Sequence, residues 1–262
     1  MSVTGDFWSY SSERLVPLDK APDFELSVAD SFLLHQGSVR SLAAHLARFE
    51  SSITDEVSLS QLPGFFDAVR NSLPLEGDWF PRIEYRASAP VGERLFLQVR
   101  NAPEQTETAT LWSNPEPDPR VSPKVKGPDL AIGMQLRRTA NLHGADEAVL
   151  LDSNGFIADG ALSSIMWWRD GVLMGPDENT NWLPSVTREE AQNLAIQAGF
   201  EIGEEKCRPE DLVGLEVWNL SSTQGIRGVT KWGNIPIAVP KLFHSFRKRH
   251  TLIYAPVREI AE

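Results

Sequence analysis

Residues 126–159 read KGPDLAIGMQLRRTANLHGADEAVLLDSNGFIAD, and the interpretation of the chain starts from this stretch. A lysine opens it at the end of an extended segment, and residues 130–141 follow with the apolar spacing of an amphipathic helix. Residues 148–152 have the composition of a strand, and Asn154-Gly155 is typical of a tight β-hairpin turn. After this turn the chain is expected to run back beside the first strand, and Asp159 lies on this returning segment. The stretch therefore predicts a lysine amine and a carboxylate on neighbouring elements.

The overall composition excludes several classes of protein. A net charge of −11 disfavours nucleic acid or an anionic membrane as a partner. A single cysteine, Cys207, excludes an intrachain disulfide framework and fits a reducing compartment; we interpret it as a small buried apolar residue rather than a nucleophile. Residues 1–14 are polar, unlike a signal peptide, and no apolar run reaches the length of a membrane span. We expect a cytoplasmic protein that binds neither nucleic acid nor membrane, and no metal site is predicted.

The first half of the chain predicts a small α+β domain. Apolar spacing indicates helices over residues 41–52 and 61–72, and alternation indicates paired strands over residues 80–86 and 94–99. Gln36-Gly37 is typical of a hairpin turn. Residues 1–24 are expected to form an irregular arm or an edge strand.

A proline-rich segment, residues 114–120, is too poor in backbone donors for a helix interior or a central strand. It is interpreted as the linker between two domains. The expected division is residues 1–112 for the small domain, 113–121 for the linker and 122–262 for a larger domain. Within the larger domain we predict further strands, helices and one hairpin. The strands cover residues 165–169 and 215–220, the helices 187–199 and 242–249, and the hairpin 229–239.

The order of these elements resembles that of the class IV (fold type IV) pyridoxal-phosphate enzymes. This family includes branched-chain and D-amino-acid aminotransferases and 4-amino-4-deoxychorismate lyase. The resemblance extends over residues 25–239. It implies an α+β fold of two domains, with a small N-terminal α+β domain and a larger C-terminal pseudo-barrel that binds pyridoxal 5′-phosphate. It also implies a homodimer.

Lys126 stands where the family has the lysine that forms a Schiff base with the cofactor. A free lysine, with a pKa of about 10.4, is a poor nucleophile at neutral pH, and burial beside a cationic ring would lower that value. Once released, the amine can move the substrate's α-proton. Lys124 is the alternative at short range, but its spacing to Glu147 fits the family less well.

Asp159 matches the position of a family glutamate that binds the pyridine nitrogen. An anion there keeps the nitrogen protonated, so that the ring can accept electrons from the substrate. Aspartate is one methylene shorter than glutamate. The alternative interpretation is an ordinary aspartate at the end of a strand.

The resemblance also implies a phosphate site. Arg48, in His45-Leu-Ala-Arg48, matches an arginine that contacts the phosphate. The segment that contains Val186 and Thr187 precedes a helix and resembles the family's phosphate cup, with Ser185 in place of its glycine; Thr187 could instead be a simple helix cap. Ser221 and Ser222 follow a buried strand and match a second phosphate segment.

Several departures from the family pattern leave the substrate open. Ser164 replaces an asparagine that follows the ring-nitrogen carboxylate, and Ala29 replaces an aminotransferase tyrosine. Arg100 and the pair Arg137-Arg138 could meet a substrate carboxylate, although surface or ion-paired roles are the favoured interpretation.

The leading hypothesis is an aminotransferase that moves an amino group between an amino acid and a 2-oxo acid through a Schiff base at Lys126. One alternative is 4-amino-4-deoxychorismate lyase activity, which gives p-aminobenzoate and pyruvate. A second alternative is a non-catalytic relative that serves as a binding or dimer module.

Overall fold

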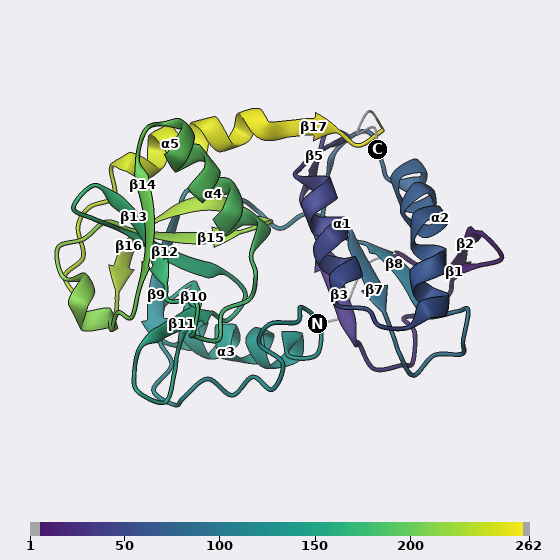
Figure 1. Cartoon of the computed structure of the whole chain (residues 1–262), viewed down its shortest axis with the longest axis horizontal. Helices are drawn as coiled ribbons and strands as arrows, with labels where there is room; N and C mark the ends of the chain where they lie inside the picture. The colour runs from purple at the N-terminus through teal and green to yellow at the C-terminus, as the bar shows by residue number, and fades with distance from the viewer. Residues whose placement is uncertain (1–5, 259–262) are drawn as a thin grey trace. The chain divides into compact units, whose positions relative to one another are not determined.

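The computed structural model describes residues 6–258, which form two compact units (Figure 1). The first unit holds residues 6–104, 125–128 and 253–258, and the second holds residues 105–124 and 129–252. Each unit is therefore assembled from separate segments of the chain. Among the described residues, no helix is both long and apolar enough to cross a membrane.

An antiparallel sheet with strand order β2-β1-β8-β7-β3 organises the first unit. Its strands are β1 (Asp6–Ser11), β2 (Arg14–Leu18), β3 (Val28–Ser31), β7 (Arg82–Tyr85) and β8 (Leu95–Val99). A smaller sheet of order β17-β5-β4-β6 contains β4 (Leu34–His35), β5 (Ser38–Arg40), β6 (Asp78–Trp79) and β17 (Tyr254–Pro256). The expected N-terminal arm is a hairpin of β1 and β2, and residues 1–5 lie outside the described residues.

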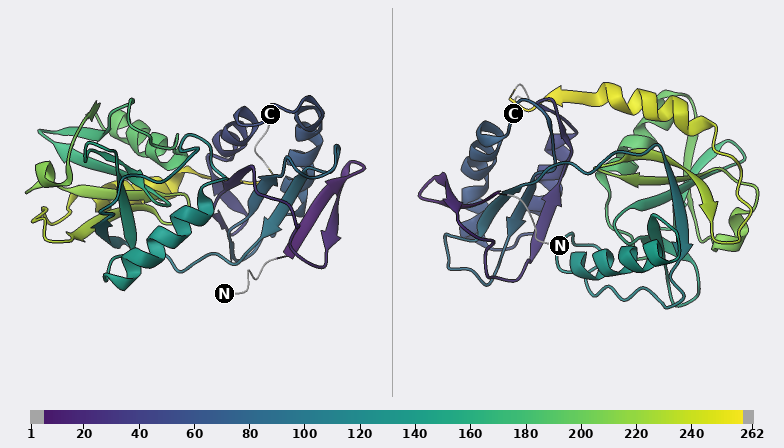
Figure 2. Two further views of the ribbon diagram at one scale, coloured as in Figure 1. Left: turned by 90° about the horizontal axis from the view of Figure 1, so that it is seen from below. Right: turned by 180° about the vertical axis from the view of Figure 1, so that it is seen from behind.

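Two helices, α1 (Leu42–Ser51) and α2 (Glu56–Ser72), cover one face of the five-stranded sheet (Figure 2). Alternate strand residues such as Val28, Ile83 and Leu97 pack with the helices in one hydrophobic core. Both predicted helices are confirmed. The second begins five residues earlier than expected, because Asp55 accepts a hydrogen bond from the amide of Ser58 and caps it.

The predicted Gln36-Gly37 turn is confirmed between β4 and β5. Both residues have positive φ, 46° for Gln36 and 72° for Gly37, as a two-residue hairpin turn of this kind requires.

The second unit is built on an eight-stranded sheet of order β11-β10-β9-β16-β15-β12-β13-β14, which curls into a half-barrel (Figure 1). The strands are β9 (Thr108–Ser113), β10 (Glu147–Leu151), β11 (Ile157–Gly160), β12 (Ser164–Arg169), β13 (Val172–Pro176), β14 (Glu201–Glu205), β15 (Val217–Ser221) and β16 (Gly225–Trp232). The turn at Asn154-Gly155 joins β10 to β11 as predicted, and Gly155 has φ 82°.

The helices of the second unit are α3 (Leu130–Leu142), α4 (Val186–Gln197) and α5 (Leu242–His250). The short 3₁₀ helices are η1 (Pro209–Leu212) and η2 (Thr251–Ile253), and the chain passes from the second unit to the first within η2. One core joins α4 and α5 to the sheet and includes Trp168, Trp218 and Phe246. The predicted helices over residues 130–141, 187–199 and 242–249 are confirmed to within two residues at each end.

The structure differs from the expected division of the chain, since residues 125–128 and 253–258 belong to the first unit, and it also differs in two strand assignments. Strand β9 lies between β10 and β16, parallel to both, so residues 105–112 belong to the second unit rather than to the small domain. The hairpin expected over residues 229–239 is reduced to one bridge, Trp232 to Ile235, because β16 pairs with β15 and β9 instead. In both cases the pairing partners lie far away in the sequence.

Candidate active site

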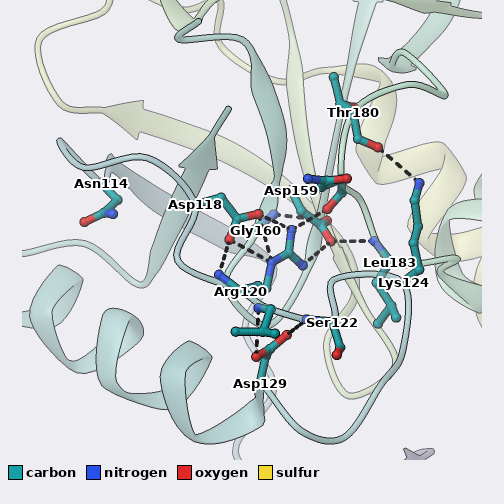
Figure 3. A network of polar contacts seen from close by, with 12 residues as sticks. Asn114, Asp118, Arg120, Ser122, Lys124, Asp129, Asp159, Gly160, Thr180 and Leu183 are labelled. Carbon is teal, nitrogen blue, oxygen red and sulfur yellow. Dashed lines mark hydrogen bonds and ion pairs between the residues drawn. The ribbon is translucent and has the colours of Figure 1, made fainter. Parts of the chain in front are cut away.

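Asp159 lies on β11 of the second unit, opposite Leu150 of β10, and is only 3% exposed. Its Oδ2 accepts hydrogen bonds from the amide of Leu183 at 3.0 Å and from Arg120 Nη1 at 3.2 Å, and its Oδ1 accepts from the amide of Gly160 at 3.1 Å (Figure 3). Burial raises the pKa of the Asp159 carboxyl, and Arg120 with the Leu183 amide opposes this only in part. The site therefore contains a buried carboxylate with an incomplete set of cationic partners.

Arg120 divides its guanidinium between two carboxylates. Nε and Nη2 donate to Asp118, with Nη2 to Oδ2 at 2.8 Å, while Nη1 donates to Asp159 and Nη2 also donates to the carbonyl oxygen of Asn181. Burial lowers the pKa of Arg120, but Asp159 and Asp118 outweigh it, and the net shift is upward. This residue comes from the proline-rich segment that the sequence predicts to be a linker. The many prolines of this segment indicate a linker, and they give no sign that Arg120 binds residues far away in the sequence.

Lys124 follows Arg120 by four residues, and its side chain is directed to Thr180 (Figure 3). Its Nζ donates to the carbonyl oxygen of Thr180 at 3.1 Å and lies 4.6 Å from the centre of the Trp182 ring (Figure 3). Partial burial of the amine lowers its pKa, and the nearby charge of Asp159 opposes that shift. Lys124, the alternative to Lys126, therefore belongs to the same unit as Asp159, the predicted partner of the pyridine nitrogen.

A second feature of the site is the N-terminus of α4. Ser185 is its cap and accepts a hydrogen bond from the Arg188 amide at 3.2 Å, so Thr187 is not the capping residue. Val186 and Thr187, which occupy the first turn, are 5% and 2% exposed. Amides of a first helical turn have no partner within the helix and are oriented to bind anions.

The turn between β15 and β16 contributes hydroxyl groups. Ser221 Oγ accepts from the amide of Gln224 at 3.2 Å and lies 3.3 Å from Thr223 Oγ1. Ser222 follows it in the same turn and is half-buried. Because α4 packs against β15 in one unit, this turn and the α4 N-terminus are two candidate phosphate-binding segments of that unit.

Two other predicted site residues belong to the first unit. The carbonyl oxygen of Lys126 accepts a hydrogen bond from the Ala29 amide at 2.7 Å, which attaches residues 125–128 to the edge strand β3. Gly127 comes so close to this strand, with φ 153°, that a Cβ there would lie 2.7 Å from the Ser27 carbonyl oxygen. A glycine after Lys126 therefore permits the close approach.

Arg48 on α1 binds a carboxylate that the sequence did not reveal. Its Nε and Nη2 donate to Asp30 at 2.7 and 2.9 Å, and His45 Nδ1 lies 2.8 Å from the same carboxylate. Asp30 is fully buried, so His45 is a packed residue with a specific partner, as expected of a non-catalytic histidine. Asp159, Val186, Thr187, Ser221 and Ser222 thus lie in the second unit, whereas Arg48 and Lys126 lie in the first.

Two further expectations can be compared with the structure. Cys207 is 2% exposed, and burial raises the pKa of its thiol to about 12, in agreement with a structural rather than a nucleophilic role. Arg100 is half-buried, and its guanidinium donates hydrogen bonds to the Phe80 carbonyl oxygen and to Ser31 Oγ.

Solved structures share this fold over nearly the full chain. The branched-chain amino acid aminotransferase from Escherichia coli superposes with a TM-score of 0.75 at 18% identity, covering 93% of this chain and 92% of that one. A hypothetical aminotransferase from Mycobacterium tuberculosis in its PLP-bound form gives a TM-score of 0.78 at 14% identity, covering 95% and 98%. The predicted two-part fold with a pseudo-barrel is confirmed.

Sequence relatives are of two kinds. The branched-chain-amino-acid aminotransferase of Escherichia coli strain K12 is 36% identical over 83 residues, which are 32% of this chain and 26% of that protein. This match therefore spans about a quarter of that relative's length. The aminodeoxychorismate lyase of Bacillus subtilis strain 168 is 23% identical over 251 residues, which cover 87% of this chain and 85% of that protein. A sequence model of the family described as Amino-transferase class IV matches residues 27–232, and the chain therefore belongs to this family of enzymes.

Proposed function

We propose that this chain is a pyridoxal-phosphate-dependent aminotransferase that moves an amino group between an amino acid and a 2-oxo acid, with a Schiff base at Lys126. The observation that carries the proposal is the environment of the Asp159 carboxylate. Its carboxylate is buried and has a raised pKa, and Arg120 neutralises it only partly because Arg120 is shared with Asp118. A protonated pyridine nitrogen would supply the additional positive charge.

The residues of the second unit fit both ends of such a cofactor. Asp159 accepts hydrogen bonds and can accept one more from a ring nitrogen. The first-turn amides of Val186 and Thr187, together with the hydroxyl groups of Ser221 and Ser222, provide donors for a phosphate dianion. Arg48, whose guanidinium also binds Asp30, is proposed as an arginine contact of the cofactor phosphate.

Pyridoxal phosphate, when bound, would supply an electron sink for negative charge that develops at the substrate α-carbon. Asp159 would keep the ring nitrogen protonated and thereby maintain that sink. Lys126 would hold the cofactor through its amine and, once released, take the α-proton and return it. The protein is proposed to work as a cytoplasmic homodimer.

A lyase acting on 4-amino-4-deoxychorismate is the second candidate. It is favoured by the Bacillus subtilis relative, an aminodeoxychorismate lyase that matches over 85% of its length. Both activities begin with removal of an α-proton, so the residues above would serve either one.

Two measurements on the purified protein separate these possibilities. The protein is expected to carry the visible absorbance of lysine-bound pyridoxal phosphate and to lose it on reduction with borohydride. A panel of L- and D-amino acids with 2-oxoglutarate should then give a new amino acid, whereas aminodeoxychorismate should give no pyruvate. Pyruvate and p-aminobenzoate as products would instead assign the lyase. A protein that cannot be loaded with the cofactor would refute both and leave a non-catalytic relative.

A further inference from the structure

Helix α5 contacts the elements that contain both candidate phosphate-binding segments of the second unit, although it belongs to neither segment. It packs against α4, whose first turn is one of these segments, and against β16, which begins where the other segment ends (Figure 1). Arg247 and His250 lie three residues apart on α5, and residues at this spacing are neighbours on one face of a helix. This face therefore presents two polar side chains side by side.

Arg247 binds the main chain of the turn between β15 and β16. Its Nη1 donates to the carbonyl oxygen of Gln224 at 2.8 Å and to that of Ile226 at 2.9 Å. These two carbonyl groups flank Gly225, where the chain enters β16 with φ 66°. The carbonyl and the amide of one planar trans peptide point in opposite directions, so the contacts also fix the direction of the amides that follow. Arg247 thus sets the orientation of the last peptides of this turn.

Gln224 connects this contact to a hydroxyl group of the turn. It is buried, and its Oε1 accepts a hydrogen bond from the amide of Thr106 at 2.8 Å, so its side chain is fixed as well as its carbonyl group. Its own amide donates to Ser221 Oγ at 3.2 Å. A hydroxyl oxygen that accepts such a bond has fewer orientations for its own hydrogen. Arg247 can therefore influence Ser221 through Gln224.

His250 binds the helix of the other segment. Its Nε2 lies 2.8 Å from Glu190 Oε2, and the two residues are 2% and 7% exposed. Glu190 lies one helical turn after Val186 and Thr187, whose amides belong to the first turn of α4. Apolar packing between helices is non-directional, whereas a buried hydrogen bond has a defined length and angle. The contact between His250 and Glu190 therefore fixes where α4, and with it its first turn, lies against α5.

The basic residues in the last turn of α5 differ in their surroundings. Cations are common in this position because they interact favourably with the negative end of the helix dipole. Lys248 and Arg249 are exposed, as this general role allows, and the guanidinium carbon of Arg249 lies 5.8 Å from the centre of the Phe246 ring. Arg247 is half-buried and is bound to the turn between β15 and β16. The helix dipole alone does not account for these contacts of Arg247.

We propose that Arg247 and His250 are positioning residues for the phosphate group of the cofactor. Arg247 positions the turn that contains Ser221 and Ser222, and His250 positions the first turn of α4 through Glu190. Both act through other residues and touch no ligand themselves. Naming the anion as the cofactor phosphate rests on the proposed function. The positioning of an anion site does not, because inorganic phosphate can probe that site by itself.

The experiment titrates the cofactor-free full chain with pyridoxal 5′-phosphate and with pyridoxal, which has the same ring and aldehyde but no phosphate. The ratio of the two dissociation constants isolates the contribution of the phosphate group. Arg247→Met keeps the aliphatic part of the side chain and removes its hydrogen bonds to the turn. It should lower the preference for the phosphorylated ligand by about 10-fold, the equivalent of one lost phosphate contact, and leave the affinity for pyridoxal unchanged.

Three further variants of α5 complete the set. Arg249→Met is the matched control, because Arg249 is an exposed arginine of the same helical turn, and it should keep the preference of the unaltered protein. Arg247→Lys keeps a cation that can donate to both carbonyl oxygens, so it should restore most of the preference. His250→Phe keeps a ring and loses the contact with Glu190, and it should also lower the preference. It keeps the test decisive if Arg247→Met folds poorly.

The remaining outcomes separate the two proposals. Arg247→Met and His250→Phe proteins with an unaltered preference, or with equal losses of affinity for both aldehydes, would overturn the positioning role alone. An unaltered protein that binds both aldehydes equally well would do the same, because its phosphate site would then contribute nothing.

Inorganic phosphate covers the case in which neither aldehyde binds, which by itself would overturn the proposed function. Weaker binding of inorganic phosphate to Arg247→Met than to Arg249→Met would then still support the positioning role. Equal binding to these two variants, or no binding to the unaltered protein, would overturn that role as well.

Discussion

Each unit contains a buried aspartate in a network with an arginine, and the two aspartates have opposite properties. Burial acts to raise the pKa of Asp30 in the first unit, but Arg48 and His45 outweigh it and hold the pKa well below its usual range. Asp159 in the second unit has a raised pKa, because burial prevails over an Arg120 that also serves Asp118. The two residues have the same side chain and similar burial, so the difference arises from their partners.

This difference distinguishes a carboxylate that stabilises the fold from one that is available to a ligand. Asp30 is hydrogen-bonded to Arg48 and to His45 on one helix, so its negative charge is compensated where it stands. Asp159 shares Arg120 with Asp118, so a further cation would stabilise its carboxylate. We infer that Asp30 stabilises the first unit and positions Arg48, whereas Asp159 is available to a positively charged ligand.

The largest effect is expected from Asp30→Asn. This change leaves Arg48 and His45 without their anion, and breaking a buried pair in this way costs about 3–5 kcal/mol of unfolding free energy. Urea unfolding measures it. The control is Asp67→Asn, since Asp67 is exposed and its pair with Arg70 contributes below about 1 kcal/mol. Equal effects of the two changes would contradict the structural role of Asp30.

Asp159→Asn is expected to act on catalysis more than on folding. Arg120 keeps Asp118, and the Leu183 amide can still donate to an asparagine oxygen, so the unfolding free energy should change by less than about 1.5 kcal/mol. The rate of α-proton removal should fall by about 10²–10³-fold, because the ring nitrogen loses its anion. Single-turnover kinetics with an α-deuterated amino acid measures this step.

Asp152→Asn is the matched control for that experiment. Asp152 stands in the same hairpin, and its carboxylate accepts hydrogen bonds from the amides of Asn154 and Phe156. It should leave the rate of proton removal unaltered. An Asp159→Asn protein as fast as this control would show that another group supports the ring.

The smallest effect is a pair of opposite pH dependences in the protein without cofactor. Asp30 has a lowered pKa when folded, so its stabilisation is present above the unfolded value of about 3.9 and is lost as the pH falls below it. Asp159 has a raised pKa, so its contribution is present below about pH 3.9 and is lost as the pH rises through the folded value.

Unfolding free energies of the unaltered protein and of both asparagine variants, measured from about pH 7 to about pH 3, test these signs. The advantage of the unaltered protein over Asp159→Asn should grow as the pH falls. Its advantage over Asp30→Asn should shrink, and only near the acid end. Parallel slopes for the two variants would remove the distinction on which the comparison rests.

Local signals in the sequence predicted much of this architecture. The dipeptides Gln36-Gly37 and Asn154-Gly155 mark the positions of their turns, and the helices beginning at Leu130 and Val186 follow from apolar spacing. Such features depend on neighbours in the chain, which is why one sequence was enough to find them.

The charged networks could not be predicted in this way. Arg120 finds Asp159 39 residues away and the Asn181 carbonyl 61 residues away, and nothing in its proline-rich surroundings indicates either partner. Strand β9 is likewise defined by β10 and β16 rather than by its own composition. Even Asp30, 18 residues before Arg48, is indistinguishable from a surface aspartate until the helix packs on the sheet.

The most direct test of the central claim is to reduce the cofactor-loaded protein with borohydride and to locate the phosphopyridoxyl group by peptide mass analysis. Lys126→Met and Lys124→Met proteins serve as the matched pair. The account predicts that the group is attached at Lys126, that Lys124→Met is still labelled, and that Lys126→Met is not. A label at Lys124, or no label on either lysine, would contradict it.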